Sequence, residues 1–108
     1  MGGRSTSPSV EYLDLDSGLW ILARSMRVPR TLFPACVMNG RIYVSGGLDS
    51  ESSCEYYDPT RGYWTLFSRL SVRRSRHGMV AAHGKLYVAG GYGTAQYLTS
   101  AECFDPAT

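Results

Sequence analysis

Residues that build metal centres and disulfide frameworks are scarce in this chain. Its 108 residues include two histidines and three cysteines, and neither type occurs in pairs at ligand spacing. An odd number of isolated cysteines predicts neither a disulfide framework nor a zinc site. Each of Cys36, Cys54 and Cys103 lies in an apolar pattern, where a cysteine behaves as a small hydrophobe. We therefore expect no metal and no cofactor.

Groups for catalysis are missing as well. No nucleophile, base and orienting group can be assembled from the sequence pattern. His83 takes the place of an asparagine in a predicted tight turn, and several aspartates also fall in turns, where they favour backbone hydrogen bonds. The sequence therefore predicts that the chain is not an enzyme.

An excess of one charge and long apolar runs are also absent. The net charge of +2 is too small to predict a nucleic-acid surface. No apolar run approaches the ~18 residues that cross a bilayer, and the first residues lack the hydrophobic core of a secretory signal. We expect a cytoplasmic protein that neither binds nucleic acid nor spans a membrane.

Glycine and aromatic residues are plentiful, and they recur at a regular spacing. The sequence NGRIYVSGG at residues 39–47 returns as HGKLYVAGG at residues 83–91, 44 residues later. Trp20 and Trp64 have the same separation, and an Asp-Pro pair recurs after 47 residues. A period in this range predicts stacked supersecondary units, and paired glycines with a tryptophan favour propeller blades.

The repeated residues resemble those of the kelch-repeat family. The matching stretches are RRSRHG at residues 73–78, GKLYVAGG at residues 84–91 and AECFDP at residues 101–106, and Trp64 follows a Tyr-Asp-Pro sequence. The resemblance covers residues 10–106. It implies an all-β fold, a partial kelch-type β-propeller of about two four-stranded antiparallel blades whose ring is not closed.

Short runs rich in Val, Ile, Tyr, Trp and Leu, separated by turn residues, predict β-strands from Val10 onward. No apolar stripe of helical period persists along the chain. The nine predicted strands are Val10–Leu15, Leu19–Ala23, Ala35–Met38, Arg41–Ser45, Cys54–Tyr57, Tyr63–Phe67, Gly78–Ala82, Lys85–Ala89 and Ser100–Phe104.

The family's order of four strands per blade divides these strands unevenly. After a flexible segment at residues 1–9, residues 10–34 supply the third and fourth strands of one blade and a linker. Residues 35–67 form a complete blade, and residues 68–106 supply the first three strands of the next. Because closed propellers have four to eight blades, we expect a piece of a longer propeller. The alternative is a protomer that self-associates through its open blade edges.

Several repeated residues are expected to build the blades. Glycine at a strand end allows a positive φ and a close backbone approach, and the tryptophans are expected to pack between blades. A glutamate and a tyrosine also recur at fixed repeat positions. The predicted structural residues are Gly46, Gly47, Gly90, Gly91, Trp20, Trp64, Tyr43, Tyr87, Glu55 and Glu102.

The most chemically suggestive segment is the arginine loop, defined as residues 69–77 and, one repeat earlier, residues 25–33. The later copy contains Arg69, Arg73, Arg74 and Arg76, followed by His77. Guanidinium groups bind carboxylates bidentately, so this loop is a candidate site for an acidic peptide. The other interpretation is a solvated charged loop in which one arginine anchors the backbone.

The resemblance implies where a partner would bind. In kelch proteins that act as substrate receptors, ligand-facing side chains come from the arginine loop and from the glycine loop, which follows the double glycine (residues 91–100 and 47–53). The predicted partner-binding residues are Ser75, Arg76, Tyr92, Tyr97 and Arg74. The preceding repeat holds Thr31, Leu32, Leu48 and Ser53 at these places. All of these are uncharged, so an acidic peptide is expected only at the later repeat.

The resemblance also implies a function. It predicts a protein–protein interaction module similar to the substrate-recognition propeller of BTB-kelch adaptors, which recruit a cullin-type ubiquitin ligase. The sequence contains no BTB segment, so a cullin ligase would be reached only through domains absent here. The alternatives are an actin-binding cytoskeletal scaffold and a fragment of a kelch-type propeller enzyme. An enzyme would need metal-binding or sugar-binding residues that this stretch does not display.

Overall fold

The computed structural model describes residues 10–48 and 52–106, and within these ranges it contains no helix. The predicted flexible segment at residues 1–9 lies outside the described residues. The strands are β1 (Val10–Asp14), β2 (Leu19–Ala23), β3 (Ala35–Met38), β4 (Arg41–Ser45), β5 (Cys54–Asp58), β6 (Tyr63–Leu66), β7 (Gly78–Ala82), β8 (Lys85–Ala89) and β9 (Ala101–Phe104). No helix that could cross a membrane is therefore found in this part of the chain.

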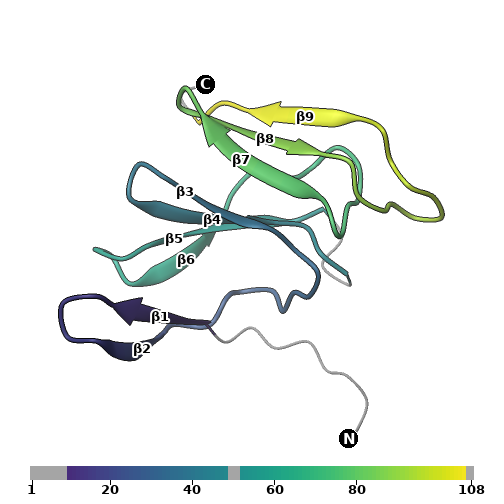
Figure 1. Ribbon diagram of the computed structural model, residues 1–108. Helices are drawn as coiled ribbons and strands as arrows, with labels where there is room; N and C mark the ends of the chain where they lie inside the picture. Colours follow the sequence, from purple (N-terminus) through teal and green to yellow (C-terminus); the bar gives the residue numbers. More distant parts are fainter. Residues whose placement is uncertain (1–9, 49–51, 107–108) are drawn as a thin grey trace, which may run out of the picture.

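Each of the nine predicted strands is present, and no boundary differs by more than one residue. The strands form three antiparallel sheets, with the orders β1-β2, β3-β4-β5-β6 and β7-β8-β9. The first, middle and third sheets lie one above another in chain order (Figure 1). The fold is therefore all-β and has the arrangement of partial propeller blades, as the sequence predicts.

Matching hairpin turns explain the register of the inner strand pairs. Asn39 (φ 54°) and Gly40 (φ 74°) join β3 to β4, and His83 (φ 52°) and Gly84 (φ 75°) join β7 to β8. Two successive residues with positive φ form the type I′ turn, whose twist fits paired strands. His83 therefore has a turn role, as its repeat position predicts.

The hydrophobic core lies on both faces of the middle sheet. Successive side chains of β4 point to opposite faces, so Val44 packs toward the first sheet and Tyr43 toward the third. The cluster on the side of the first sheet comprises Ala23, Met26, Val44, Tyr57 and Trp64. The cluster on the side of the third sheet comprises Met38, Tyr43 and Leu86, with partly buried neighbours that include Phe67 and Phe104.

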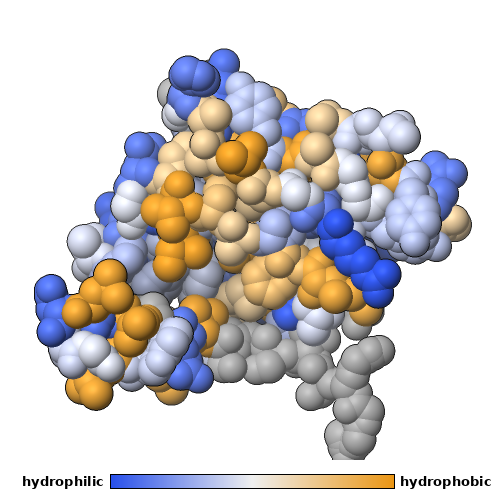
Figure 2. All heavy atoms as spheres, viewed as in Figure 1, coloured by the Kyte–Doolittle hydropathy of each residue, from blue (hydrophilic) through white to orange (hydrophobic). Residues whose placement is uncertain are grey.

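Side chains at equivalent positions of the outer sheets are exposed. Trp20 is 66% exposed whereas Trp64 is 2% exposed, and Tyr87, the counterpart of Tyr43, is 38% exposed. Figure 2 shows apolar side chains gathered at the surface over β1 and β2. The expected packing of a tryptophan between blades is present at Trp64 and absent at Trp20. The reason is that no described residue covers the face of the first sheet that carries Trp20.

Candidate protein-binding site

In the middle blade, the buried side chain of Arg30 stabilises the arginine loop. Nη2 of Arg30 donates to Oε2 of Glu55 at 3.0 Å, and both side chains are 0% exposed. Nη1 of Arg30 donates to the carbonyl oxygens of Gly46 and Ser53 at 2.9 and 2.8 Å. Glu55 also accepts from two backbone N–H groups of the arginine loop at 2.7 and 2.9 Å. The pair therefore ties the arginine loop to the glycine loop of the same blade.

The third blade repeats this arrangement with Arg74 and Glu102. Nε of Arg74 donates to Oε2 of Glu102 at 3.2 Å, and Nη1 donates to the carbonyl oxygens of Gly90 and Ser100, each at 2.9 Å. Glu102 accepts from the backbone N–H of Ser71 at 2.8 Å. Because Arg74 is 1% exposed, its predicted contact with a partner is not supported. Its guanidinium instead holds the loop in place.

Arg30 was not among the residues predicted for either role. The repeat register carries the signal that identifies it, since Arg30 precedes Arg74 by 44 residues, as Thr31 precedes Ser75. Each of these two arginines forms an ion pair with the glutamate of its own blade: Arg30 with Glu55, and Arg74 with Glu102. Both loops are therefore anchored by the same chemistry.

The backbone of Arg76 is hydrogen-bonded to the arginine loop of the neighbouring middle blade. Its φ of 56° is left-handed, and Leu32 at the same repeat position has a φ of 55°. The N–H of Arg76 donates to the carbonyl oxygen of Leu32 at 2.8 Å, which joins the two arginine loops. A positive φ in such residues is uncommon and persists where the surroundings enforce it. Both side chains are exposed, so Arg76 is available at the surface.

The two predicted tyrosines lie together, and Tyr92 lies next to Ser75. Ser75 and Tyr92 exchange two backbone hydrogen bonds of 3.0 and 2.9 Å. The rings of Tyr92 and Tyr97 meet edge to face, with centroids 5.1 Å apart. Tyr92 is 37% and Tyr97 77% exposed, whereas Ser75 is 8% exposed. The glycine loop that carries both rings projects from the third blade between β8 and β9 (Figure 1), and a partner would meet the tyrosines rather than the serine.

A pocket of about 240 Å³ lies beside these residues, between the middle and third blades. It is lined by Gly47, Leu48, Arg73, Arg74, Ser75, Tyr92, Gly93 and Thr94. The lining combines aromatic, aliphatic and polar surface, and none of these residues is acidic. Aromatic residues and arginine are enriched in protein interfaces. The composition of the pocket therefore resembles that of a protein interface.

His77 is buried near both glycine pairs and is not accessible to a partner. It is 7% exposed, and its Nε2 shares a hydrogen bond of 2.9 Å with Oγ of Ser45. A β-carbon added to Gly91 would lie 2.7 Å from Cβ of His77 and 2.6 Å from the carbonyl oxygen of Ser75. One added to Gly46 would lie 2.5 Å from the carbonyl oxygen of Arg74. The glycine pairs thus make room for the arginine loop.

The burial of His77 makes stability depend on pH. Burial, with the charge of Arg74 as a second cause, lowers the pKa of His77 from 6.5 to about 4. As the pH falls below about 6.5, His77 becomes protonated in the unfolded chain but stays neutral in the folded protein. The stability that is present above pH 6.5 is therefore lost progressively as the pH falls toward 4. We expect this group to lower the free energy of unfolding by about 2 kcal/mol between pH 7 and pH 5, measured by urea denaturation.

A variant separates His77 from the other titrating groups. His77→Phe introduces the residue that the preceding repeat carries at this position, Phe33. The variant is expected to lose most of the change in stability between pH 7 and pH 5. If the variant kept the full change, the dependence would belong to another group.

Two of the three cysteines, Cys36 and Cys54, are poorly suited to act as nucleophiles. All three are free, and burial raises the pKa of Cys36 and raises that of Cys54 to about 11. Thiols with raised pKa values stay protonated and are poor nucleophiles. Among residues 10–48 and 52–106, no group of three or more His, Cys, Asp or Glu side chains is placed to hold a metal ion.

The stacked antiparallel sheets, with their repeated glycine, tryptophan and arginine–glutamate positions, define a repeat protein of the β-propeller class. The family model described as Kelch motif matches residues 29–71 and 73–108. The chain belongs to the kelch-repeat family.

Two proteins of Arabidopsis thaliana, both named as F-box/kelch-repeat proteins, are similar to this chain. One is 50% identical over 52 residues, which cover 44% of this chain and 14% of the relative. The other is 47% identical over 45 residues, which cover 42% of this chain and 15% of the relative. The chain therefore matches about one seventh of the length of each relative.

Proposed function

We propose that the chain is a non-enzymatic module that binds another protein through the third blade. The binding surface consists of the 240 Å³ pocket, Arg76, Tyr92 and Tyr97. The observation that carries the proposal is the combination of exposed arginine and tyrosine side chains with a backbone fastened by Arg74. Tyr and Arg are prominent among the residues that dominate binding energy, and a preorganised loop loses little conformational entropy on binding.

The proposed partner is an acidic peptide segment. Arg73 lines the pocket and the exposed Arg76 lies in the same loop, so the surface of the third blade carries positive charge where an acidic segment would bind. The equivalent positions of the middle blade, including Leu32 and Leu48, are uncharged. An acidic segment would therefore be directed toward the third blade, with its apolar side chains toward Leu48.

The Arg76→Ala variant tests this surface. A charge-assisted hydrogen bond contributes about 1.5–3 kcal/mol, so affinity for an acidic peptide should fall by roughly ten- to 150-fold. The matched control is Arg61→Ala, since Arg61 is an exposed arginine in the turn between β5 and β6 that is paired with Asp58. Titration calorimetry with one acidic peptide, selected on the unsubstituted chain, measures both variants. Equal losses in the two variants would show that net charge, and not this surface, drives binding.

We further propose that the module presents its partner to a ubiquitin ligase in the cytoplasm. The two relatives are named for an F-box together with the kelch repeat, whereas the sequence alone favoured a BTB-kelch arrangement. Both domains act as adaptors of cullin-type ligases, so either would place this chain in the substrate-recognition part. Cullin would be contacted by regions outside the 108 residues.

Affinity purification of the natural polypeptide that contains this chain tests the adaptor proposal. The expected result is co-purification of a cullin, together with a partner whose recovery falls in the Arg76→Ala variant. Co-sedimentation with actin filaments, without a cullin, would assign the chain to the cytoskeleton and overturn the proposal.

A further inference from the structure

Two exposed side chains hold matching positions on the arginine loops of the middle and third blades. Leu32 precedes Arg76 by 44 residues, and both have a left-handed φ, of 55° and 56°. Leu32 is 44% exposed, and Arg76 is also exposed. A positive φ in residues other than glycine is strained and is concentrated at ligand-binding and other functional sites. The fold therefore presents a leucine and an arginine at its surface in the same strained backbone conformation.

The glycine loops of the two blades match in the same way. Leu48 precedes Tyr92 by 44 residues, and each forms an isolated antiparallel bridge with the arginine loop of its own blade. Leu48 is 41% exposed, Tyr92 is 37% exposed, and both line the 240 Å³ pocket. Each blade thus exposes one side chain from each of its two loops. We call Leu32 and Leu48 the apolar pair, and Arg76 and Tyr92 the cationic pair.

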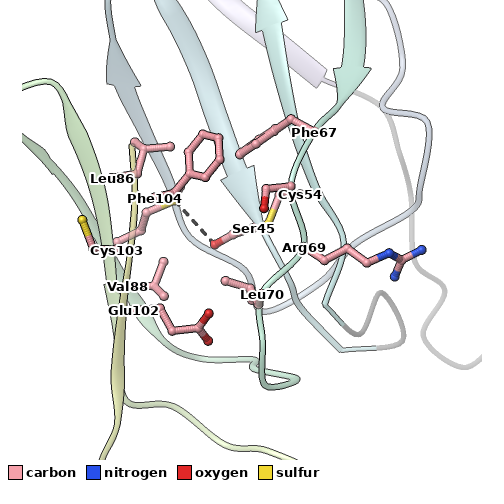
Figure 3. A pocket seen from close by; sticks show the side chains of 12 residues that line it. Ser45, Cys54, Phe67, Arg69, Leu70, Leu86, Val88, Glu102, Cys103 and Phe104 are labelled. Atoms are coloured by element: carbon pink, nitrogen blue, oxygen red, sulfur yellow. Dashed lines mark hydrogen bonds between the residues drawn. The ribbon is translucent and has the colours of Figure 1, made fainter. Parts of the chain in front are cut away.

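Contacts between the blades fix the spacing of the two pairs. The N–H of Arg76 donates to the carbonyl oxygen of Leu32 at 2.8 Å, and a second bond of 2.8 Å joins the glycine loop of the middle blade to the arginine loop of the third. Between the two sheets, the ring of Phe104 lies next to that of Phe67, with centroids 5.1 Å apart (Figure 3). A ligand therefore meets the two pairs side by side on one connected surface.

The two pairs differ in the ligand groups that they can bind. The guanidinium of Arg76 binds a carboxylate through charge-assisted hydrogen bonds, whereas the apolar pair gains free energy only by burying apolar surface. Alternate residues of an extended chain point to the same side and lie about 6.6 Å apart. Because the backbones of Leu32 and Arg76 are directly hydrogen-bonded, two alternate residues of one extended segment can reach both positions.

We propose that the chain recognises an extended peptide segment in which an acidic residue and a large apolar residue are two positions apart. The acidic side chain pairs with Arg76, and the apolar side chain packs against the apolar pair. This inference deepens the function proposed above and rests on it, because both use the surface of the arginine and glycine loops. It adds the requirement that charge alone does not select the partner.

A phage-displayed library of random dodecapeptides, selected on the 108-residue chain, tests the proposal without assuming a sequence. We expect enrichment of peptides in which Asp or Glu is two positions from Leu, Ile, Met or Phe, in either order. One enriched peptide is then synthesised and measured by fluorescence polarisation. Replacing its apolar residue with alanine should weaken binding by about tenfold, because part of an apolar side chain is no longer buried.

Exchanging the two repeat positions should change the selected sequences in a defined direction. Leu32→Arg introduces the residue of the third blade and should replace the apolar preference with a second acidic one at the same spacing. Arg76→Leu should replace the acidic preference with an apolar one. Each incoming residue already occurs at this φ in the other repeat, so neither exchange is expected to unfold the chain. The control is Leu15→Arg in the turn between β1 and β2, which should leave the selected sequences unchanged.

The outcomes distinguish this inference from the function on which it rests. Acidic peptides without a fixed apolar position, or sequences that Leu32→Arg does not alter, would overturn the inference and leave the binding surface in place. If no peptide were enriched, both proposals would be wrong. Leu32→Asn is a second test, since asparagine tolerates a left-handed φ. It should remove the apolar preference while the acidic preference persists, and loss of both preferences would contradict separate roles for Leu32 and Arg76.

Discussion

Glu55→Ala is expected to lower the free energy of unfolding by about 3–5 kcal/mol, because it leaves the buried guanidinium of Arg30 without its counter-charge. The Arg30 side chain is 0% exposed, so bulk water does not screen its charge. The change also leaves two backbone N–H groups of the arginine loop without their acceptors. The loss should appear as a lower urea midpoint, followed by circular dichroism.

The third blade supplies the matched control for this prediction. Glu102 has the same repeat position, but its side chain is 21% exposed and accepts one backbone N–H from Ser71. Glu102→Ala should therefore cost about 1–3 kcal/mol, because solvent can reach the remaining groups. A loss at Glu102 equal to that at Glu55 would contradict the role of burial.

A double replacement separates the effect of leaving one buried charge unpaired from the effect of losing the ion pair itself. Replacing a buried ion pair with apolar residues of similar volume is often neutral or stabilising, whereas removing one partner is costly. Arg30→Met combined with Glu55→Leu should therefore lose less stability than Glu55→Ala alone. A double variant that is less stable than the single one would show that the backbone contacts of Arg30 matter more than its charge.

The strands could be predicted from the sequence because their signals are local. The alternation in residues 41–45 and the turn at Asn39 and Gly40 act over a few residues, so the hairpin is encoded where it forms. The repeat then transfers the same structure to residues 85–89 and to the turn at His83. Even the positive φ of His83 could be predicted, because His83 occupies the repeat position that Asn39 holds one repeat earlier.

The orientation of the arginines could not be predicted in the same way. Arg74 and Arg76 are separated by a single residue in the same charged loop. Arg74 is nevertheless buried, whereas Arg76 is exposed. The difference arises because the carbonyl oxygens of Gly90 and Ser100, distant in sequence, converge on Arg74. The exposure of Trp20 has a similar origin, since it depends on whether another sheet covers that face.

Trp64→Ala is the second change expected to have a large effect, a loss of about 3–5 kcal/mol in the free energy of unfolding. Removing the indole opens a cavity between the first and middle sheets and breaks the hydrogen bond to Arg24. It also removes the ring contact with Tyr57. Urea denaturation measures the loss, and disappearance of a cooperative transition would be the extreme form of the same result.

Trp20→Ala is the control, because Trp20 has the same repeat position but is 66% exposed. Exposed substitutions usually change stability by less than about 0.5 kcal/mol, so the two tryptophans should differ several-fold in their effect. Trp64→Phe should lie between them, since a phenyl ring keeps the contact with Tyr57 but cannot donate to Arg24. Equal losses at Trp20 and Trp64 would mean that Trp20 is covered in solution, and would contradict the open face of the first sheet. A repeat position thus specifies an indole, and the neighbouring blade determines how much that indole stabilises the fold.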